Sequence, residues 1–278
     1  MNSEQILQEF LKGSQSIYEL LTLSKEIYNL DKNRIGNLAK LRTKVDKLDK
    51  VIRNLEEENY ILKLKEWIEQ YKSILEDTAN EIQRNLGIEL EEKLKNLGFR
   101  LSGQYPELKA GFFIIEVDFN KQRATIWYGP KQERLSQCAL TATTIANHIE
   151  KAKKELGSGL NEEELLQKIH SAYYRVVGGK RGEPAPIIEV LAELAYLLQS
   201  QKFRQDPRKE NYRSYGRADF SYDLYRVRKY QSSNLSRLRL NVATRIDTRR
   251  RANFLWVPDD ESGKGTTYSK LVFEEAEK

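Results

Sequence analysis

The first 97 residues contain no proline, and their apolar residues recur at helical spacing. The strictest run is spaced alternately by three and four positions and consists of Leu38, Leu41, Val45, Leu48, Ile52 and Leu55. Asn59 and Leu62 continue this register, and a second run of the same kind follows from Leu64 to Ile82. Such spacing is typical of the a and d positions of a heptad repeat, so it predicts long helices with an apolar seam that must be covered.

The seam can be covered in two ways, and the sequence leaves both open. The helices can pack on each other as an intramolecular hairpin or bundle, or they can form a coiled coil between chains. In both cases we expect residues 1–97 to be an assembly region, which mediates self-association or binds a partner protein. Its 16 Lys and Arg against 18 Asp and Glu make it a poor candidate for binding a polyanion.

The helical periodicity stops at the segment GFRLSGQYPELKAG, which contains three glycines and a proline. We therefore expect a linker at residues 98–110 and a separate domain over residues 111–278. Two strands around a turn near Asn120 are predicted next. Phe113, Ile115 and Val117 share one face of the first strand, and Phe112 and Ile114 share the other. Two apolar faces indicate a strand that is covered on both sides.

Three helices are expected after these strands. The first begins near Thr141, and the second begins at the N-cap Asn161, with Glu164 as its capping-box partner. The third follows Pro184-Ala185-Pro186, with proline in its first turn. The predicted fold class is therefore α+β: long N-terminal helices are followed by a mixed α/β globular domain with antiparallel strands.

Residues 201–257 carry most of the positive charge, with 15 Lys and Arg against five Asp and Glu. The whole chain has a net charge of +6, so the remaining residues sum to −4. We expect a helix over 217–230 and a strand from about residue 237 that turns Leu238, Leu240 and Val242 toward the core. Its opposite face would carry Arg237, Arg239, Asn241 and Arg245. A triple arginine then marks a turn, and two more strands would complete an antiparallel sheet with one basic face.

Cations interleaved with tyrosines suit a polyanion, because arginine pairs bidentately with phosphate and tyrosine stacks on exposed bases. We expect nucleic acid as the partner, and DNA rather than RNA. The predicted contact residues are Lys180, Arg181, Arg208, Lys209, Tyr212, Arg213, Tyr215, Arg237, Arg239, Arg245, Arg249, Arg250 and Arg251. Two alternatives stay open: an adaptor that binds an acidic protein, and arginines with a purely structural use.

No motif in the sequence names a reaction, and we expect a non-catalytic subunit without a cofactor. With one cysteine and two histidines, the chain lacks the residues of a Cys- or His-based metal cluster. A Mg²⁺ nuclease is the enzyme class most compatible with a basic surface, and Asp118, Asp219 and Asp223 are the candidate catalytic carboxylates. The strand-to-strand spacing of acids and lysine that such nucleases use is absent, however.

The expected location is the cytoplasm. No apolar run approaches the ~20 residues of a membrane span, and the first residues do not have the pattern of a secretory signal. A subunit of an intracellular DNA-handling or defence complex would suit this layout, by analogy alone.

Overall fold

A computed structural model of the protein describes residues 3–53, 59–180, 182–231 and 237–274. The chain forms two compact units, Met1–Glu89 and Leu90–Lys278, and their boundary falls within the long helix α3 (Asn59–Asn96). Helices and antiparallel sheets are both present, and the long helices come first, so the predicted α+β class is confirmed. Among the described helices, none is both long and apolar enough to cross a membrane.

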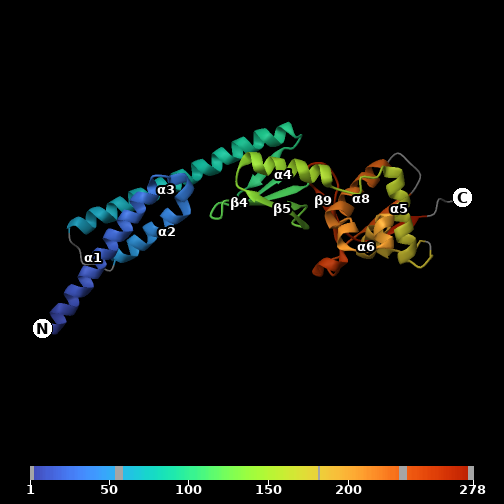
Figure 1. Ribbon diagram of the computed structural model, residues 1–278. Coiled ribbons are helices and arrows are strands. Elements are labelled where there is room, and N and C mark those ends of the chain that lie inside the picture. The colour runs from blue at the N-terminus through green and yellow to red at the C-terminus, as the bar shows by residue number, and fades with distance from the viewer. Residues whose placement is uncertain (1–2, 54–58, 181, 232–236, 275–278) are drawn as a thin grey trace. The chain divides into compact units, whose positions relative to one another are not determined.

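The first unit contains α1 (Ser3–Asp31), α2 (Arg34–Arg53) and most of α3 (Figure 1). One apolar core joins the three helices and consists of Leu20, Leu23, Ile27, Leu41, Val45, Leu48, Ile52, Ile68, Tyr71 and Leu75. The described part of the heptad seam is therefore covered within the chain, by α1 and α3. Leu55 and the side chains of Asn59 and Leu62 lie outside the described part of the seam.

Polar contacts fix the ends of these helices. Asp31, the last residue of α1, accepts a hydrogen bond from Arg34 Nε at 2.7 Å and another from the hydroxyl of Tyr71. Lys72 Nζ lies 3.0 Å from the Asp49 carboxylate and so joins α3 to α2. These bonds between helices favour packing within one chain.

The second unit begins with a five-stranded antiparallel sheet whose strands pair in chain order. They are β1 (Leu101–Gln104), β2 (Glu107–Ala110), β3 (Phe113–Asp118), β4 (Arg123–Tyr128) and β5 (Glu133–Ala139). The two predicted strands are β3 and β4. Residues 98–110, where we expected a linker, instead contain β1 and β2. Gly103 lies within β1, and Gly111, just after this segment, lies in the tight turn between β2 and β3 with a φ of +56°.

The helix α4 (Ala142–Glu155) packs against β4 and β5 (Figure 1). Its first turn is capped by Thr141, whose hydroxyl accepts a hydrogen bond from Thr144 N. Phe113, Ile115 and Val117 on one face of β3 are buried as predicted. The opposite face carries Ile114, Glu116 and Asp118, which are only partly buried, so β3 is covered less evenly than expected.

The rest of the unit packs helices against a second, four-stranded sheet. The main helices are α5 (Glu162–Val176), α6 (Ile187–Leu197) and α8 (Arg217–Gln231), and the short ones are α7 (Gln201–Gln205), η1 (Lys209–Asn211), η2 (Asp247–Arg249) and η3 (Arg251–Asn253). The strands are β6 (Ala185–Pro186), β7 (Arg237–Val242), β8 (Leu255–Pro258) and β9 (Gly265–Glu274). The expected cap of α5 is present, since Asn161 accepts a hydrogen bond from Glu164 N at 2.9 Å. Pro186 is the N-cap of α6 rather than a residue of its first turn, because it pairs with β9.

The strand order of this sheet differs from the predicted one. β7 and β8 follow each other along the chain, but each pairs with β9. Tyr268 of β9 is opposite Val242 on one side and opposite Leu255 on the other, so β9 lies between them. The connection from β7 to β8 therefore passes from one side of β9 to the other instead of making a hairpin.

Candidate nucleic-acid interface

The first half of the basic stretch places its predicted residues at the surface. Lys209 is exposed, and Arg208 Nε lies 3.1 Å from the Asp206 carboxylate. Tyr212 is about half exposed, and its ring centroid is 5.5 Å from that of Phe203. These side chains are accessible, but the Arg208 charge is partly neutralised.

Arg213 and Tyr215 are bound to the body of the protein instead. Arg213 Nη2 donates to the Ser158 carbonyl at 2.6 Å. Tyr215 is only 5% exposed, and its hydroxyl donates to Asp223 Oδ2 at 2.8 Å. The prediction that Tyr215 contacts nucleic acid is corrected here, because a buried ring whose hydroxyl satisfies a carboxylate has no face for a base.

Asp219 and Asp223, two of the candidate catalytic carboxylates, hold backbone groups together. Asp219 accepts hydrogen bonds from Gly157 N at 3.0 Å and from Gly216 N at 2.8 Å. Asp223 is fully buried and accepts from Ser158 N at 2.8 Å. Burial raises the pKa of both carboxyls, and the hydrogen bonds that they accept oppose this rise. These contacts indicate a structural role at the start of α8.

Asp118, the third candidate, lies at the end of β3. It accepts a hydrogen bond from Lys121 N at 3.0 Å, and its carboxylate forms an ion pair with Lys121 Nζ at 3.3 Å. Within the part of the chain that the structure describes, no three His, Cys, Asp or Glu side chains are placed to share a metal ion. Asp219 and Asp223 of α8 are engaged with the neighbouring backbone groups of Gly157 and Ser158, and Asp118 is engaged with Lys121.

The expected basic face of β7 is weaker than predicted. Arg239 forms an ion pair with Glu274 of the neighbouring strand at 2.8 Å. The side chain of Arg237 and all of Arg181 lie outside the described residues. Arg245 lies beyond Val242, where β7 ends, and so does not belong to the strand face. Lys180 is exposed in the loop before β6, 3.8 Å from Glu183.

The cations gather instead in the connection between β7 and β8, residues 243–254, which we call the arginine loop. Its four arginines are all exposed: Arg245, Arg249, Arg250 and Arg251. The only acid in this segment is Asp247, whose carboxylate accepts hydrogen bonds from Thr244 N and Oγ1, each at 2.8 Å. In the described part of the chain, no ion pair involves Arg245, Arg249 or Arg250.

The arginine loop is held in a defined conformation. Ala243 N donates to the Thr267 carbonyl of β9 at 2.8 Å, and Asn253 N donates to the Arg250 carbonyl at 2.9 Å. Arg251 donates to the carbonyl of Gln132. Hydrogen bonds from the backbone and side chain of Thr244 lower the pKa of Asp247, so this carboxylate stays charged and keeps the turn closed. The remaining cations therefore project from a fixed turn.

Arg217, which sequence reasoning did not single out, adds charge at the base of the arginine loop. It donates a hydrogen bond to the Phe254 carbonyl, and its buried Nε has no partner among the described residues. Burial, and then the positive charge of Arg251, lower the pKa of Arg217. Two neighbouring cations of this kind favour an incoming anion. In the sequence, Arg217 is marked only by its position at the start of the helix predicted over residues 217–230.

The sequence also did not indicate that two apolar side chains of this region, Val242 and Ile246, are exposed. Ile246 is 72% exposed in the turn, and Val242 is 62% exposed at the end of β7. We predicted that Val242 faces the core with Leu238 and Leu240. A β-bulge between Asn241 and Val242 interrupts the strand alternation, so that prediction is wrong for Val242.

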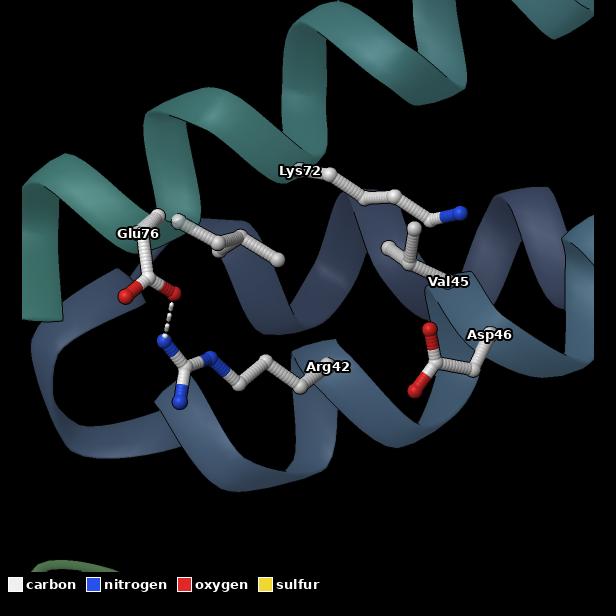
Figure 2. A pocket seen from close by; sticks show the side chains of 6 residues that line it. Arg42, Val45, Asp46, Lys72 and Glu76 are labelled. Carbon is white, nitrogen blue, oxygen red and sulfur yellow. Dashed lines mark hydrogen bonds and ion pairs between the residues drawn. The ribbon is translucent and has the colours of Figure 1, made fainter.

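The first unit contains a hollow of about 240 Å³ between α2 and α3. Figure 2 shows Arg42 and Glu76 facing each other across it, with their ion pair at 2.6 Å. Lys72, on the same rim, pairs with Asp49. Since these charges neutralise one another, we assign the hollow to helix packing.

No family model, curated protein or solved structure matches this chain. Its function is therefore inferred from surface chemistry. The structure brings Arg245, Arg249, Arg250 and Arg251 together in one turn. The other predicted cations come from separate segments before β6, before α8 and on β7.

Proposed function

We propose that this chain is a non-catalytic nucleic-acid-binding subunit whose arginine loop contacts the phosphate backbone. The observation that carries the proposal is a fixed turn with exposed arginines, three of which have no ion pair among the described residues. Guanidinium groups pair bidentately with phosphate oxygens, so such a turn offers several strong contacts to a polyanion. Duplex DNA is the preferred ligand, because it carries one negative charge per ~1.7 Å of helix axis.

The internal bonds of the candidate carboxylates support a role without catalysis. Asp219 and Asp223 already accept backbone hydrogen bonds, and Asp118 is paired with Lys121. A Mg²⁺ nuclease would need such carboxylates free to converge on the ion. If the purified protein cleaves DNA in Mg²⁺ and the activity disappears in Asp118→Ala, the proposal of a non-catalytic subunit is contradicted.

We also propose that the N-terminal helices mediate assembly, with themselves or within a larger complex. The heptad seam is used inside the unit, so the contact would use other side chains. Exposed apolar residues along α1 support this role, and they are Ile17, Tyr18, Leu21 and Tyr28. If the full chain stays monomeric in light scattering at high concentration, self-association is contradicted. Assembly would then require a different partner protein.

The test of nucleic-acid binding compares three forms of the full chain. The first is the unmodified protein, and the second carries Arg245→Ala, Arg249→Ala and Arg250→Ala. The third is a matched control with Lys25→Ala, Lys47→Ala and Lys50→Ala, which removes three exposed charges from the first unit. Binding to duplex DNA and to RNA, measured by fluorescence anisotropy, is expected to weaken in the arginine variant and to persist in the control. Absence of binding by the unmodified protein at low salt would exclude the proposal.

One observation favours a second candidate, an adaptor for an acidic protein. Ile246 and Val242 are exposed beside the arginines, and apolar side chains combined with arginine are common at the core of protein interfaces. The test is a competition in which a glutamate-rich peptide is added to the DNA complex. If the peptide displaces DNA no better than simple salt at the same ionic strength, this candidate is contradicted.

A further inference from the structure

We propose that Ile246 is an apolar wedge that inserts between base steps of duplex DNA from the minor groove, while Arg245, Arg249 and Arg250 hold the flanking phosphates. This inference rests on the proposed function and specifies how the arginine loop binds. It assigns the loop two separate contributions, one electrostatic and one apolar.

Ile246 is an exposed apolar residue. Its side chain is 72% exposed, in the same turn as three arginines without described ion pairs. Burying such a side chain removes apolar surface from water, which is favourable, so an exposed position leaves this free energy available for a partner. A phosphate backbone offers little apolar surface, whereas the faces of base pairs do. An isoleucine among arginines therefore fits a duplex whose bases it can reach.

The position of Ile246 is fixed by the turn. Ile246 is the N-cap residue of η2, with φ −72° and ψ −44°, and its carbonyl accepts a hydrogen bond from Arg249 N at 3.3 Å. On either side of it, Asp247 Oδ2 accepts hydrogen bonds from the backbone N and the hydroxyl of Thr244, each at 2.8 Å. A turn closed in this way loses little conformational freedom when it binds, which favours insertion of a rigid side chain.

The shape of the arginine loop argues for the minor groove. The major groove admits an α-helix or a two-stranded ribbon. The arginine loop contains only the three-residue helices η2 and η3, and its flanking strands β7 and β8 pair with β9 instead of with each other. Arginines bind the strongly negative minor groove, and isoleucine is among the side chains that wedge open a base step there. Such wedges kink DNA by roughly 20–90°.

The test measures bending and affinity in the same samples. A 20-base-pair duplex carries a donor fluorophore at one end and an acceptor at the other. Binding of the full chain is expected to raise energy transfer, because a kink brings the ends together. Ile246→Ala is expected to weaken binding about tenfold without changing its salt dependence, and to abolish the rise in energy transfer. Ile246→Leu should keep both properties.

Ile35→Ala is the matched control, because Ile35 is similarly exposed but lies in α2. It should bind and bend DNA like the unmodified protein. If the unmodified protein binds without raising energy transfer, or if Ile246→Ala bends DNA equally well, the wedge is excluded but the proposed function remains. If no form binds duplex DNA, both proposals are excluded.

Discussion

At the scale of single residues, Gln132 shows how one amide can join two sheets. It is 6% exposed in the turn between β4 and β5. Its Oε1 accepts a hydrogen bond from Trp256 N at 2.6 Å, and its Nε2 donates to the Trp256 carbonyl at 3.2 Å. The Gln132 carbonyl in turn accepts from Arg251. One residue thus positions β8 and the end of the arginine loop.

Gln132→Leu should therefore be strongly destabilising. The substitution leaves the buried N–H of Trp256 without its acceptor, whereas the Trp256 carbonyl keeps its hydrogen bond from the Ser221 hydroxyl at 2.6 Å. One unsatisfied group costs about 1–3 kcal/mol, so we expect the free energy of unfolding to fall by roughly 1–3 kcal/mol in urea titrations. Gln137→Leu on the exposed part of β5 is the control and should change it by less than about 0.5 kcal/mol. Equal effects of the two substitutions would show that the Trp256 contacts are unimportant.

The ionisation of Tyr71 lowers the stability of the first unit at alkaline pH. Burial, and then the hydrogen bond to Asp31, raise the pKa of its hydroxyl to about 12. An unfolded tyrosine has a pKa of about 10. Because the folded pKa is higher, this stabilisation is complete below pH ~10 and is lost as pH rises from ~10 through ~12.

We expect Tyr71→Phe to remove this pH dependence. The free energy of unfolding of the unmodified protein, minus that of the variant, should shrink as the pH rises from about 10 to about 12 in circular-dichroism titrations. Tyr18→Phe replaces an exposed tyrosine of the same unit and is the control. A difference that stays constant over this range would contradict the assigned role of Tyr71.

At the scale of elements, local sequence patterns predicted where most helices and strands form. They did not predict which elements pack or pair with each other. The three-four spacing of Leu41, Val45 and Leu48 predicted a seam, but the choice of partner helix depends on contacts distant in sequence, such as Tyr71 with Asp31. The strands β1 and β2 have four residues each, too few to display a clear alternation. Sheet order also escaped prediction, because nothing local indicates that β9 lies between β7 and β8.

Leu48→Ala tests whether the seam is used within the chain. Leu48 is completely buried against α1 and α3, and removing such a side chain typically costs 2–5 kcal/mol. We expect a loss of that order in urea unfolding, with no change in the solution mass of the folded protein. Leu21→Ala, which alters an exposed position on α1, should leave stability nearly unchanged. A lower mass for Leu48→Ala would instead indicate that the seam joins chains.

At the scale of the whole molecule, charge is distributed unevenly along the chain. Residues 1–97 are slightly acidic, and residues 201–257 hold an excess of ten positive charges. The sequence therefore leads us to expect a polyanion as the partner. It did not predict which cations and tyrosines are accessible to a ligand, because this depends on contacts in the folded protein. Glu274 forms an ion pair with Arg239, and Asp223 accepts a hydrogen bond from the hydroxyl of Tyr215. The arginine loop is the part of the basic stretch where such internal partners are fewest among the described residues.

The most direct test of this account is the salt dependence of DNA binding. For duplex DNA, log K falls with log salt concentration with a slope of about −0.9 per phosphate contacted. Replacing Arg245, Arg249 and Arg250 should make this slope shallower by about 2.7, which is three contacts at about 0.9 each. The lysine control in the first unit should keep the original slope. Equal slopes for the arginine variant and the unmodified protein would show that the arginine loop does not bind the phosphate backbone.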